Sequence, residues 1–296
     1  MSSSMSTVEA VEVAPLPPIA APLRRVLEVF GFWAIWVALG FALHLGGEAY
    51  LLAGVPLTIA FQLLVRRRPL GELWIRGGPL RFDAMSLGLG VGFAVLPMLA
   101  IVKALRGHAW LGAAWGVCAL IGAFGAGVAF RRLGKWGWKQ LALCLLVGGS
   151  LGSVTMLGSA LVRHFMLHLP FQFGLRAFGG SLLLYVAVCF VLEEVSFRGA
   201  VDAHLNPPGH WKFGYAVIAS ALWGLWHLPL VLAMPLPTPM PLVTRVIATS
   251  ISLAVVHMLL GVPLSYFYGR TGNLAVSSTT HAFVDAIRNA LGMMPT

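Results

Sequence analysis

Long apolar runs recur along this sequence and set the strongest limit on how it can fold. A helix that crosses a bilayer needs about 20 apolar residues, and runs of that kind fill most of the chain. Charged residues make up only 10% of the 296 positions, against about 25% in an average soluble protein. So few charges could not cover a soluble surface, which disfavours a soluble enzyme, a disordered chain and a nucleic-acid module. We expect an all-α fold, a polytopic membrane helix bundle.

The apolar runs predict eight or nine membrane spans. The second run is short and could form half of a hairpin, so a count of eight stays open. Residues 1–23, ahead of the first run, are rich in Ser, Val and Pro and predict a disordered cytoplasmic tail. The runs cover residues 29–45, 49–65, 82–102, 109–130, 141–161, 178–197, 213–234, 242–268 and 273–291.

The basic residues predict the orientation of these spans. Lys and Arg gather in the cytoplasmic loops of membrane proteins. With the N-terminus in the cytoplasm, 14 of the 20 Lys and Arg residues lie inside and six lie outside. This asymmetry favours a cytoplasmic N-terminus and accounts for the formal net charge of +10. No nucleic-acid partner is expected, because the sequence has no basic stripe with interleaved aromatic residues.

Two adjacent glutamates, Glu193 and Glu194, end the apolar run in LLLYVAVCFVLEEVSFRGA. A charged group near the bilayer centre costs at least about 2.5 kcal/mol. Glu194 and Arg198 are four residues apart, so on a helix they share a face and can pair. Glu193 is rotated from Glu194 by about 100° and can point elsewhere, with less charge compensation. That suits a general base, although a charged cluster that only ends a span would look the same.

Two further apolar runs carry histidine. His227, in ALWGLWHLPLVL, follows Trp223 by one turn and precedes Pro229, which bends a helix or disturbs its hydrogen bonds. His281 and Asp285, in VSSTTHAFVDAI, are four residues apart and project from one face. Each group alone could be a hydrogen-bonded core residue. Together with the glutamates they predict a polar intramembrane cavity, because ionisable groups in a membrane usually face a cavity and one another.

The residues leave the chemistry of this cluster open between water activation, metal ligation and a proton relay. The His-Glu-x-x-His zinc motif, the Gly-x-Ser-x-Gly elbow and a phosphate-binding loop are absent from the sequence. The cysteines, Cys118, Cys144 and Cys189, have a spacing that suits neither a zinc site nor a disulfide framework, and we expect buried, inert thiols. His257 is expected to hold a core hydrogen bond, and His204, in a loop, is expected to be solvated.

At these residues the chain resembles the CPBP family of intramembrane proteases, also called the Abi or CAAX-protease family, which includes bacteriocin-processing relatives. The family pattern is Glu-Glu-x-x-x-Arg, then Phe-x-x-x-His, then His-x-x-x-Asn/Asp, on three helices in that order. The resemblance covers roughly residues 180–290 and includes the segment LSYFYGRTGNLAVSSTTHAFVDA. The residues that match the pattern are Glu193, Glu194, Arg198, His227, His281 and Asp285.

The resemblance implies a CPBP-family intramembrane endopeptidase, of the glutamate type or a metallo-endopeptidase. Under this resemblance Glu193 is the base that activates water, and His227 assists it. Glu194 is held by Arg198 and orients the site. The resemblance also implies that residues 176–296 form the catalytic transmembrane core. The apolar runs predict that residues 24–175 form N-terminal transmembrane helices.

The last motif and two departures from the family pattern complete this expectation. His281 and Asp285 would stabilise the oxyanion or complete a water-binding cluster. Trp223 stands where phenylalanine is usual, an exchange of one aromatic residue for another that should preserve packing. Asp285 stands where asparagine is common in the prenyl-protein branch, so it adds a negative charge.

The residues do not decide whether a metal is present. Two glutamates and two histidines could ligate zinc, and a metal would then be held by Glu193, His227 and His281. By resemblance, the prenyl-protein branch is argued to work as a glutamate protease without a metal. The expectation is therefore either no cofactor or a divalent metal such as zinc.

The expected function is hydrolysis of a peptide bond in a membrane-associated protein or peptide, so the expected partners are that substrate and the lipid bilayer. A composition rich in Ala, Gly, Leu and Val predicts a multi-pass protein of the bacterial inner (cytoplasmic) membrane. Two alternatives stay open. One is a non-catalytic membrane protein of the same fold, such as a bacteriocin immunity factor or a scaffold, and the other is a proton-coupled transporter.

Overall fold

The computed structural model describes residues 20–77, 80–234 and 240–292, and most of these residues are helical. The predicted all-α class is confirmed, since β pairing in the described ranges is limited to one isolated bridge between Ile75 and Asn273. The tail predicted over 1–23 lies outside the described residues, apart from residues 20–23, which begin the first helix. In chain order the α-helices are α1 (Ala20–Ala42), α2 (Gly47–Ala60), α3 (Ala84–Arg106), α4 (Trp110–Arg131), α5 (Gly134–Cys144), α6 (Ser150–Leu167), α7 (Leu175–Cys189), α8 (Ala203–Leu205), α9 (Phe213–Trp226), α10 (Leu228–Ala233), α11 (Leu242–Thr271) and α12 (Leu274–Ala290).

Four tighter or wider helical segments lie between these helices. The 3₁₀ segment η2 (Leu70–Leu73) follows the second span. The π-helical segments are η1 (Phe61–Val65), η3 (Leu145–Gly149) and η4 (Val195–Asp202). Such π-helical turns are rare and often occur at functional sites.

Seven helical segments of the described chain are long and apolar enough to cross a membrane. Large apolar side chains point outward from them, as on α11, where Leu242 and Val243 are 71% and 70% exposed. An apolar surface of this extent needs lipid around it. The protein is therefore a multi-pass membrane protein, and the predicted polytopic helix bundle is confirmed.

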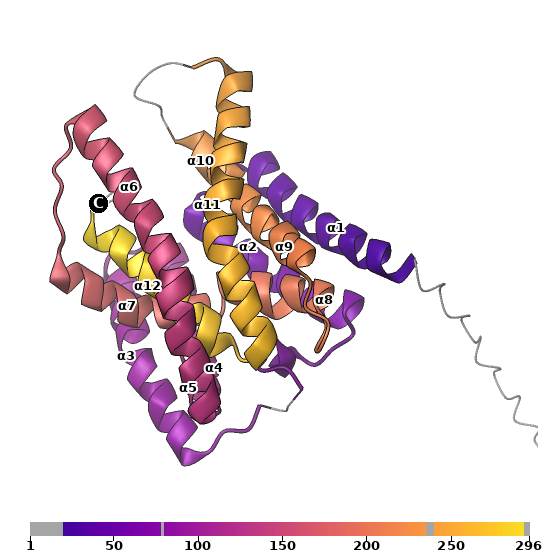
Figure 1. The fold of residues 1–296 in the computed structure, drawn as a ribbon. Helices are drawn as coiled ribbons and strands as arrows, with labels where there is room; N and C mark the ends of the chain where they lie inside the picture. Colours follow the sequence, from indigo (N-terminus) through magenta and orange to yellow (C-terminus); the bar gives the residue numbers. More distant parts are fainter. Residues whose placement is uncertain (1–19, 78–79, 235–239, 293–296) are drawn as a thin grey trace, which may run out of the picture.

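Each of the nine predicted runs coincides with helical structure, and two of them fall outside those seven segments. These are α7, which has 15 residues, and α12, which has 17. In Figure 1 α12 lies among other helices, and it contacts α5, α6, α7 and α11. A helix covered by protein need not present an apolar surface to lipid, so α12 can carry polar side chains.

The run predicted as one span over 178–197 is interrupted. Helix α7 ends at Cys189, and helical structure resumes at Glu193, just ahead of η4. The indole Nε1 of Trp74 donates a hydrogen bond of 2.6 Å to the carbonyl oxygen of Phe190, so one carbonyl at the break is satisfied. The interruption places the two adjacent glutamates at the start of a new segment.

Close helix crossings hold this segment in place. A Cβ added at Gly224 would lie 2.3 Å from the carbonyl oxygen of Leu253, so only glycine fits where α9 meets α11. Helix α7 packs along α12 in the same half of the chain, and η4 contacts α9, α11 and α12. These contacts bring three widely separated stretches of sequence to one point inside the bundle.

Candidate active site

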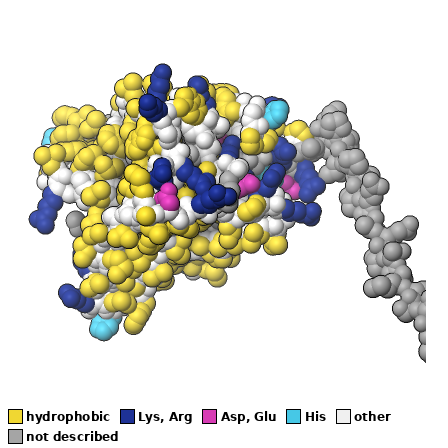
Figure 2. All heavy atoms as spheres, turned by 90° about the horizontal axis from the view of Figure 1, so that it is seen from below, with side chains coloured by type: hydrophobic (Ala, Val, Ile, Leu, Met, Phe, Trp, Pro, Cys, Tyr) yellow, Lys and Arg dark blue, Asp and Glu magenta, His cyan; other side chains and the backbone are white. Residues whose placement is uncertain are grey.

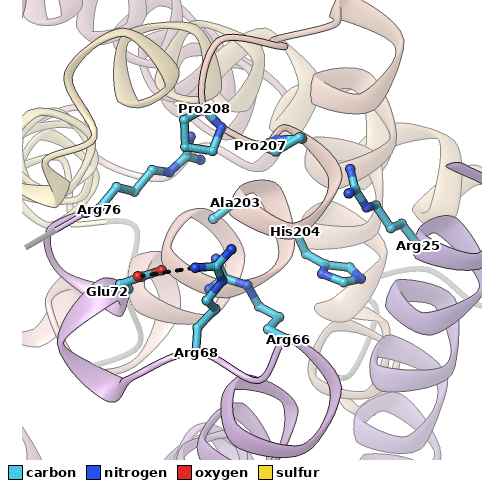
Figure 3. Close-up of a pocket in the computed structure, with 10 residues that line it drawn as sticks. Arg25, Arg66, Arg68, Glu72, Arg76, Ala203, His204, Pro207 and Pro208 are labelled. Carbon is cyan, nitrogen blue, oxygen red and sulfur yellow. Dashed lines mark ion pairs between the residues drawn. The ribbon is translucent and has the colours of Figure 1, made fainter. Parts of the chain in front are cut away.

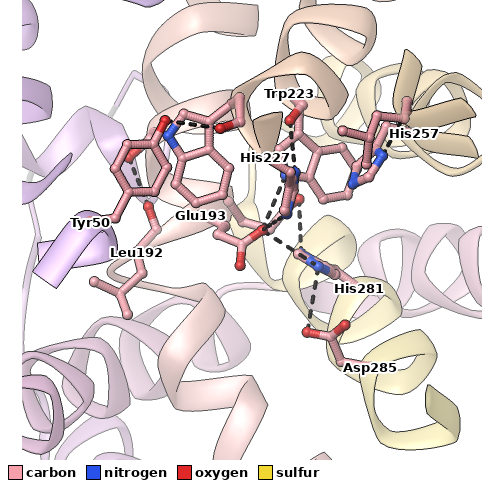
Figure 4. Close-up of polar contacts among 12 residues, drawn as sticks. Tyr50, Leu192, Glu193, Trp223, His227, His257, His281 and Asp285 are labelled. Carbon is pink, nitrogen blue, oxygen red and sulfur yellow. Dashed lines mark hydrogen bonds and ion pairs between the residues drawn. The ribbon is translucent and has the colours of Figure 1, made fainter. Parts of the chain in front are cut away.

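All six residues predicted for the site lie together in the interior of the bundle, and Figure 4 shows several of them converging. The junction between α7 and η4, the end of α9 and the middle of α12 each contribute. In that order they supply Glu193, Glu194 and Arg198, then His227, then His281 and Asp285.

Glu193 is the carboxylate on which the histidines converge. Its Oε2 lies 4.0 Å from Nε2 of His227 and 4.0 Å from Nε2 of His281. The indole Nε1 of Trp223 donates a hydrogen bond of 3.1 Å to the same oxygen. The side chains of Glu193 and His227 are 20% and 22% exposed, so the space between them is open to the outside of the helix bundle.

The spacing of these atoms suits a water molecule. Two atoms that each bind one water at about 2.8 Å lie about 4–4.5 Å apart, as do Glu193 Oε2 and the Nε2 atoms of His227 and His281, at 4.0 Å. Ligand atoms on a tetrahedral zinc ion, with bonds of about 2.1 Å, lie about 3.4 Å apart. Glu193, His227 and His281 therefore fit a water molecule better than a zinc ion.

The backbone sets the orientation of His227. Its Nδ1 lies 3.1 Å from the carbonyl oxygen of Trp223, and a carbonyl oxygen can only accept, so Nδ1 carries the proton. Nε2 then has a lone pair and faces Glu193. The ring of His257 packs against His227 with centroids 4.5 Å apart. The core hydrogen bond predicted for His257 is confirmed, because its Nδ1 lies 2.8 Å from the carbonyl oxygen of Leu253.

Glu194 has a different environment from its neighbour, as helix geometry predicted. Its side chain and that of Arg198 are both fully buried, and Arg198 Nε lies 3.8 Å from Glu194 Oε2. At this distance the two groups form an ion pair but no hydrogen bond. The predicted pairing of Glu194 with Arg198, four residues later, is confirmed. His281 Nδ1 lies 3.3 Å from Glu194 Oε1. Glu194 therefore links the first motif to the third.

The third motif contains a charge pair that the sequence analysis missed. Asp285 Oδ2 lies 3.6 Å from His281 Nε2, and Asp285 Oδ1 lies 2.9 Å from Arg288 Nη1. Arg288 follows Asp285 by three residues on α12, a spacing that could have revealed the pair. The negative charge that Asp285 adds to the family pattern is thus matched by Arg288.

Two other residues have roles that the sequence did not reveal. Trp223 was expected only to preserve packing, and it also donates to Glu193. Asp202, which is not one of the motif residues, is fully buried. Its Oδ1 accepts hydrogen bonds of 2.8 Å each from Asn206 Nδ2 and Ser265 Oγ. The four-residue spacing of Asp202 and Asn206 could have revealed one of these contacts. The contacts of Trp223 with Glu193 and of Ser265 with Asp202 join different helices, so no local spacing predicts them.

Cys189 lies beside the third motif. The three cysteines are free, and Cys144 and Cys189 are buried, as expected, while Cys118 is partly exposed. Among the described residues, potential ligand atoms of Cys189, His281 and Asp285 lie within 4.8 Å of one another. The Cys189 thiol, which was expected to be buried and inert, is therefore buried and lies close to two polar groups of the site.

Helices from the first half of the chain support the site from outside it. The hydroxyl of Tyr50 donates a hydrogen bond of 2.9 Å to the carbonyl oxygen of Trp226, the residue before His227. Thr58 Oγ1 and Ser196 Oγ lie 2.7 Å apart and join α2 to η4. The N-terminal helices therefore fix both segments that carry the first two motifs.

The fold and this cluster define a polytopic membrane protein with carboxylates and histidines gathered inside the helix bundle. Residues 175–287 match the Rce1-like family model, described as Type II CAAX prenyl endopeptidase Rce1-like. This match confirms the resemblance to the CPBP family over that segment and indicates a protease. No curated protein and no solved structure matches the chain.

Proposed function

We propose that this protein is an intramembrane endopeptidase that hydrolyses a peptide bond of a membrane-associated protein or peptide. The observation that carries the proposal is the position of Glu193. Its carboxylate is partly open to water and lies 4.0 Å from two imidazole Nε2 atoms, while adjacent Glu194 is fully buried in an ion pair. One glutamate is therefore free for chemistry and the other is structural.

The proposed reaction begins with a water molecule between Glu193 and His227. Glu193 takes one proton from this water, and the oxygen forms a bond to the carbonyl carbon of the scissile peptide. Protonated His281, which Asp285 orients, stabilises the oxyanion that forms. The carbon–nitrogen bond then breaks, and the leaving amine takes the proton held by Glu193. The products are one new carboxyl end and one new amino end.

The site lies in a bundle of membrane-crossing helices, which supports a substrate that lies in the bilayer. A cavity of about 200 Å³, lined mainly by apolar side chains, reaches Val191 and Val195 but is lined by none of the six site residues. We propose that residues 24–175 form supporting helices and that residues 176–296 form the catalytic core, most of which the family match covers. We also propose a bacterial inner-membrane location with a cytoplasmic N-terminus, on the 14-to-6 distribution of basic residues.

Replacing Glu193 tests this proposal. Glu193→Gln keeps the size of the side chain and removes the base, so we expect processing to fall at least about 100-fold. Comparing the membrane proteomes of cells with the wild-type chain and this variant should reveal an uncleaved precursor that accumulates. Glu48→Gln, which changes an exposed carboxylate outside the site, is the matched control. A folded, inserted Glu193→Gln protein that leaves every membrane protein processed as before would sink the proposal.

A proton-coupled transporter is the second candidate, and one observation favours it. Five charged or ionisable side chains form a continuous row, in the order Arg198, Glu194, His281, Asp285 and Arg288. The nitrogen–oxygen distances between successive members are 3.8, 3.3, 3.6 and 2.9 Å. The carboxylates and the imidazole in this row could relay protons, while the two guanidinium groups stay protonated. Ion flux in proteoliposomes without any cleavage product would identify a transporter. If neither flux nor cleavage occurs, a non-catalytic immunity or scaffold role is the remaining function.

A further inference from the structure

A second hollow, of about 270 Å³, lies away from the site where several membrane helices end (Figure 3). Its lining comes from the start of α1, the segment after η1, the region around η2, and α8 with the loop that follows. We name it the arginine pocket after its four arginines, Arg25, Arg66, Arg68 and Arg76, which share it with Glu72 and His204.

The positive charge of the arginine pocket is poorly compensated. Among the described residues that line it, Glu72 is the one carboxylate, and its Oε1 lies 3.9 Å from Arg68 Nη1. Arg66 donates instead to neutral oxygens, the side-chain amide oxygen of Gln62 and the carbonyl oxygen of Gly199. Burial, and to a smaller extent neighbouring Arg76, lowers the pKa of Arg66 to about 10. Guanidinium groups in such surroundings favour a bound anion.

Arg76 has hydrogen-bonding capacity to spare. Its Nη1 donates to the carbonyl oxygen of Asn206 at 3.2 Å, and its guanidinium lies over the ring of Tyr268 at 4.3 Å. Its Nε and Nη2 are buried and have no hydrogen-bond partner among the described residues. Buried donors without acceptors are costly, so an acceptor from a ligand would be stabilised here.

The nearby acid is already engaged. His204 is not solvated as expected, because its side chain is only 12% exposed and its Nε2 lies 2.8 Å from Glu28 Oε2. Glu28 also accepts a hydrogen bond of 2.7 Å from Arg24. Burial lowers the pKa of His204, so this imidazole adds little positive charge near neutral pH. Glu28 is thus held by His204 and Arg24, and it is not among the residues that line the pocket.

The position of the pocket points to the membrane interface. Arg66 and Arg68 directly follow the membrane-crossing segment Gly47–Val65, and Arg25 lies near the start of Pro22–Ala42. On the face in Figure 2, Lys and Arg side chains gather in a band bordered by hydrophobic side chains. Lipid phosphates lie at this level, and basic pockets between membrane helices bind anionic headgroups.

We infer that the arginine pocket binds a phosphate group, which an anionic phospholipid headgroup or free phosphate can supply. The fork of a guanidinium matches phosphate oxygens, and four such groups converge on one hollow. Because Arg66 also binds the carbonyl oxygen of Gly199 in η4, a bound phosphate holds η4 in place. The site is separate from the proposed active site, so its occupancy is expected to change stability whether or not the protein is a protease.

The test compares purified protein in phosphatidylcholine nanodiscs, in the same nanodiscs with added inorganic phosphate, and in nanodiscs that contain phosphatidylglycerol. We expect the anion to raise the thermal midpoint by about 3–6 °C. A rise with phosphatidylglycerol alone identifies a lipid as the source, and an equal rise with inorganic phosphate shows that free phosphate suffices. Either result supports the pocket.

Charge-removing variants locate the effect. Arg68→Gln and Arg25→Gln, at the edge of the pocket, should lose at least half of the thermal shift, as should Arg76→Gln if it folds. Arg67→Gln is the matched control, because Arg67 is exposed, adjacent in sequence and outside the lining. The inference is overturned if neither anion changes the midpoint, or if Arg67→Gln loses as much of the shift as Arg68→Gln.

Discussion

Glu193 and Glu194 are identical in type and adjacent in sequence, yet their surroundings differ. The Glu194 side chain is fully buried beside Arg198, while that of Glu193 is 20% exposed beside two histidines. The four-residue spacing to Arg198 was enough to predict which glutamate is paired. The hydrogen bond from Trp223 to Glu193 could not be predicted, because it joins residues 30 positions apart. Local spacing thus predicts contacts within a helix and misses contacts between helices.

Trp223→Phe tests the role of that hydrogen bond. The change removes the indole donor to Glu193 and keeps an aromatic ring, so we expect a folded protein with kcat/KM lowered about 10-fold. Trp226→Phe is the control, since the Trp226 indole nitrogen is equally buried and has no hydrogen-bond partner among the described residues. Equal activity of Trp223→Phe and the wild-type protein would show that Trp223 only packs.

The ion pair between Asp285 and Arg288 is expected to stabilise the protein. Arg288→Gln leaves Asp285 without its closest cation, and we expect stability to fall by about 1–2 kcal/mol. Adding Asp285→Asn, which restores the residue common in the prenyl-protein branch, should recover most of that loss. Thermal unfolding in detergent of both single variants and the double variant completes the cycle. Strictly additive effects would contradict a specific pair.

At the scale of elements, the site depends on a broken helix and on close crossings. Helix α7 stops at Cys189, and η4 carries the chain past the glutamates. The sequence did not predict this break, because the apolar run has no proline or glycine there. The partner that satisfies the Phe190 carbonyl is Trp74, 116 residues away. The crossing of α9 and α11 likewise joins residues distant in sequence, Gly224 and Leu253.

Gly224→Ala should open that crossing. Its Cβ would lie 2.3 Å from the Leu253 carbonyl oxygen and 3.0 Å from the His257 Cβ, so we expect a loss of about 1–3 kcal/mol in stability and reduced activity. Gly214→Ala lies in the same helix with nothing within 4 Å of its Cβ, and should change stability by about 0.5 kcal/mol or less. Similar thermal midpoints for the two variants would show that the crossing tolerates a side chain.

For the molecule as a whole, the sequence predicted the fold class and the three motifs whose residues lie close together, and it did not predict the supporting contacts. Apolar runs indicate membrane helices because lipid selects for length and hydropathy alone. Helix α12 is less apolar than the membrane-crossing helices, because other helices and not lipid cover it, so hydropathy alone indicates such a helix poorly. Residues from four separate segments line the arginine pocket, so no single stretch of sequence predicts it.

The predicted orientation can be tested on intact cells. With the N-terminus inside, Arg106→Cys should react with a membrane-impermeant maleimide, and Arg67→Cys should react only after permeabilisation. Both positions are exposed at the ends of helical segments. The opposite labelling pattern would contradict the predicted orientation.

In the proposed reaction Glu193 activates a water molecule that cleaves a peptide bond. The most direct measurement is cleavage of the precursor by purified protein in ¹⁸O-labelled water, with mass spectrometry of the new carboxyl end. We predict one ¹⁸O atom in that carboxyl end for the wild-type protein, and a rate at least about 100-fold lower for folded Glu193→Gln. Cleavage by folded Glu193→Gln at the wild-type rate would contradict the account.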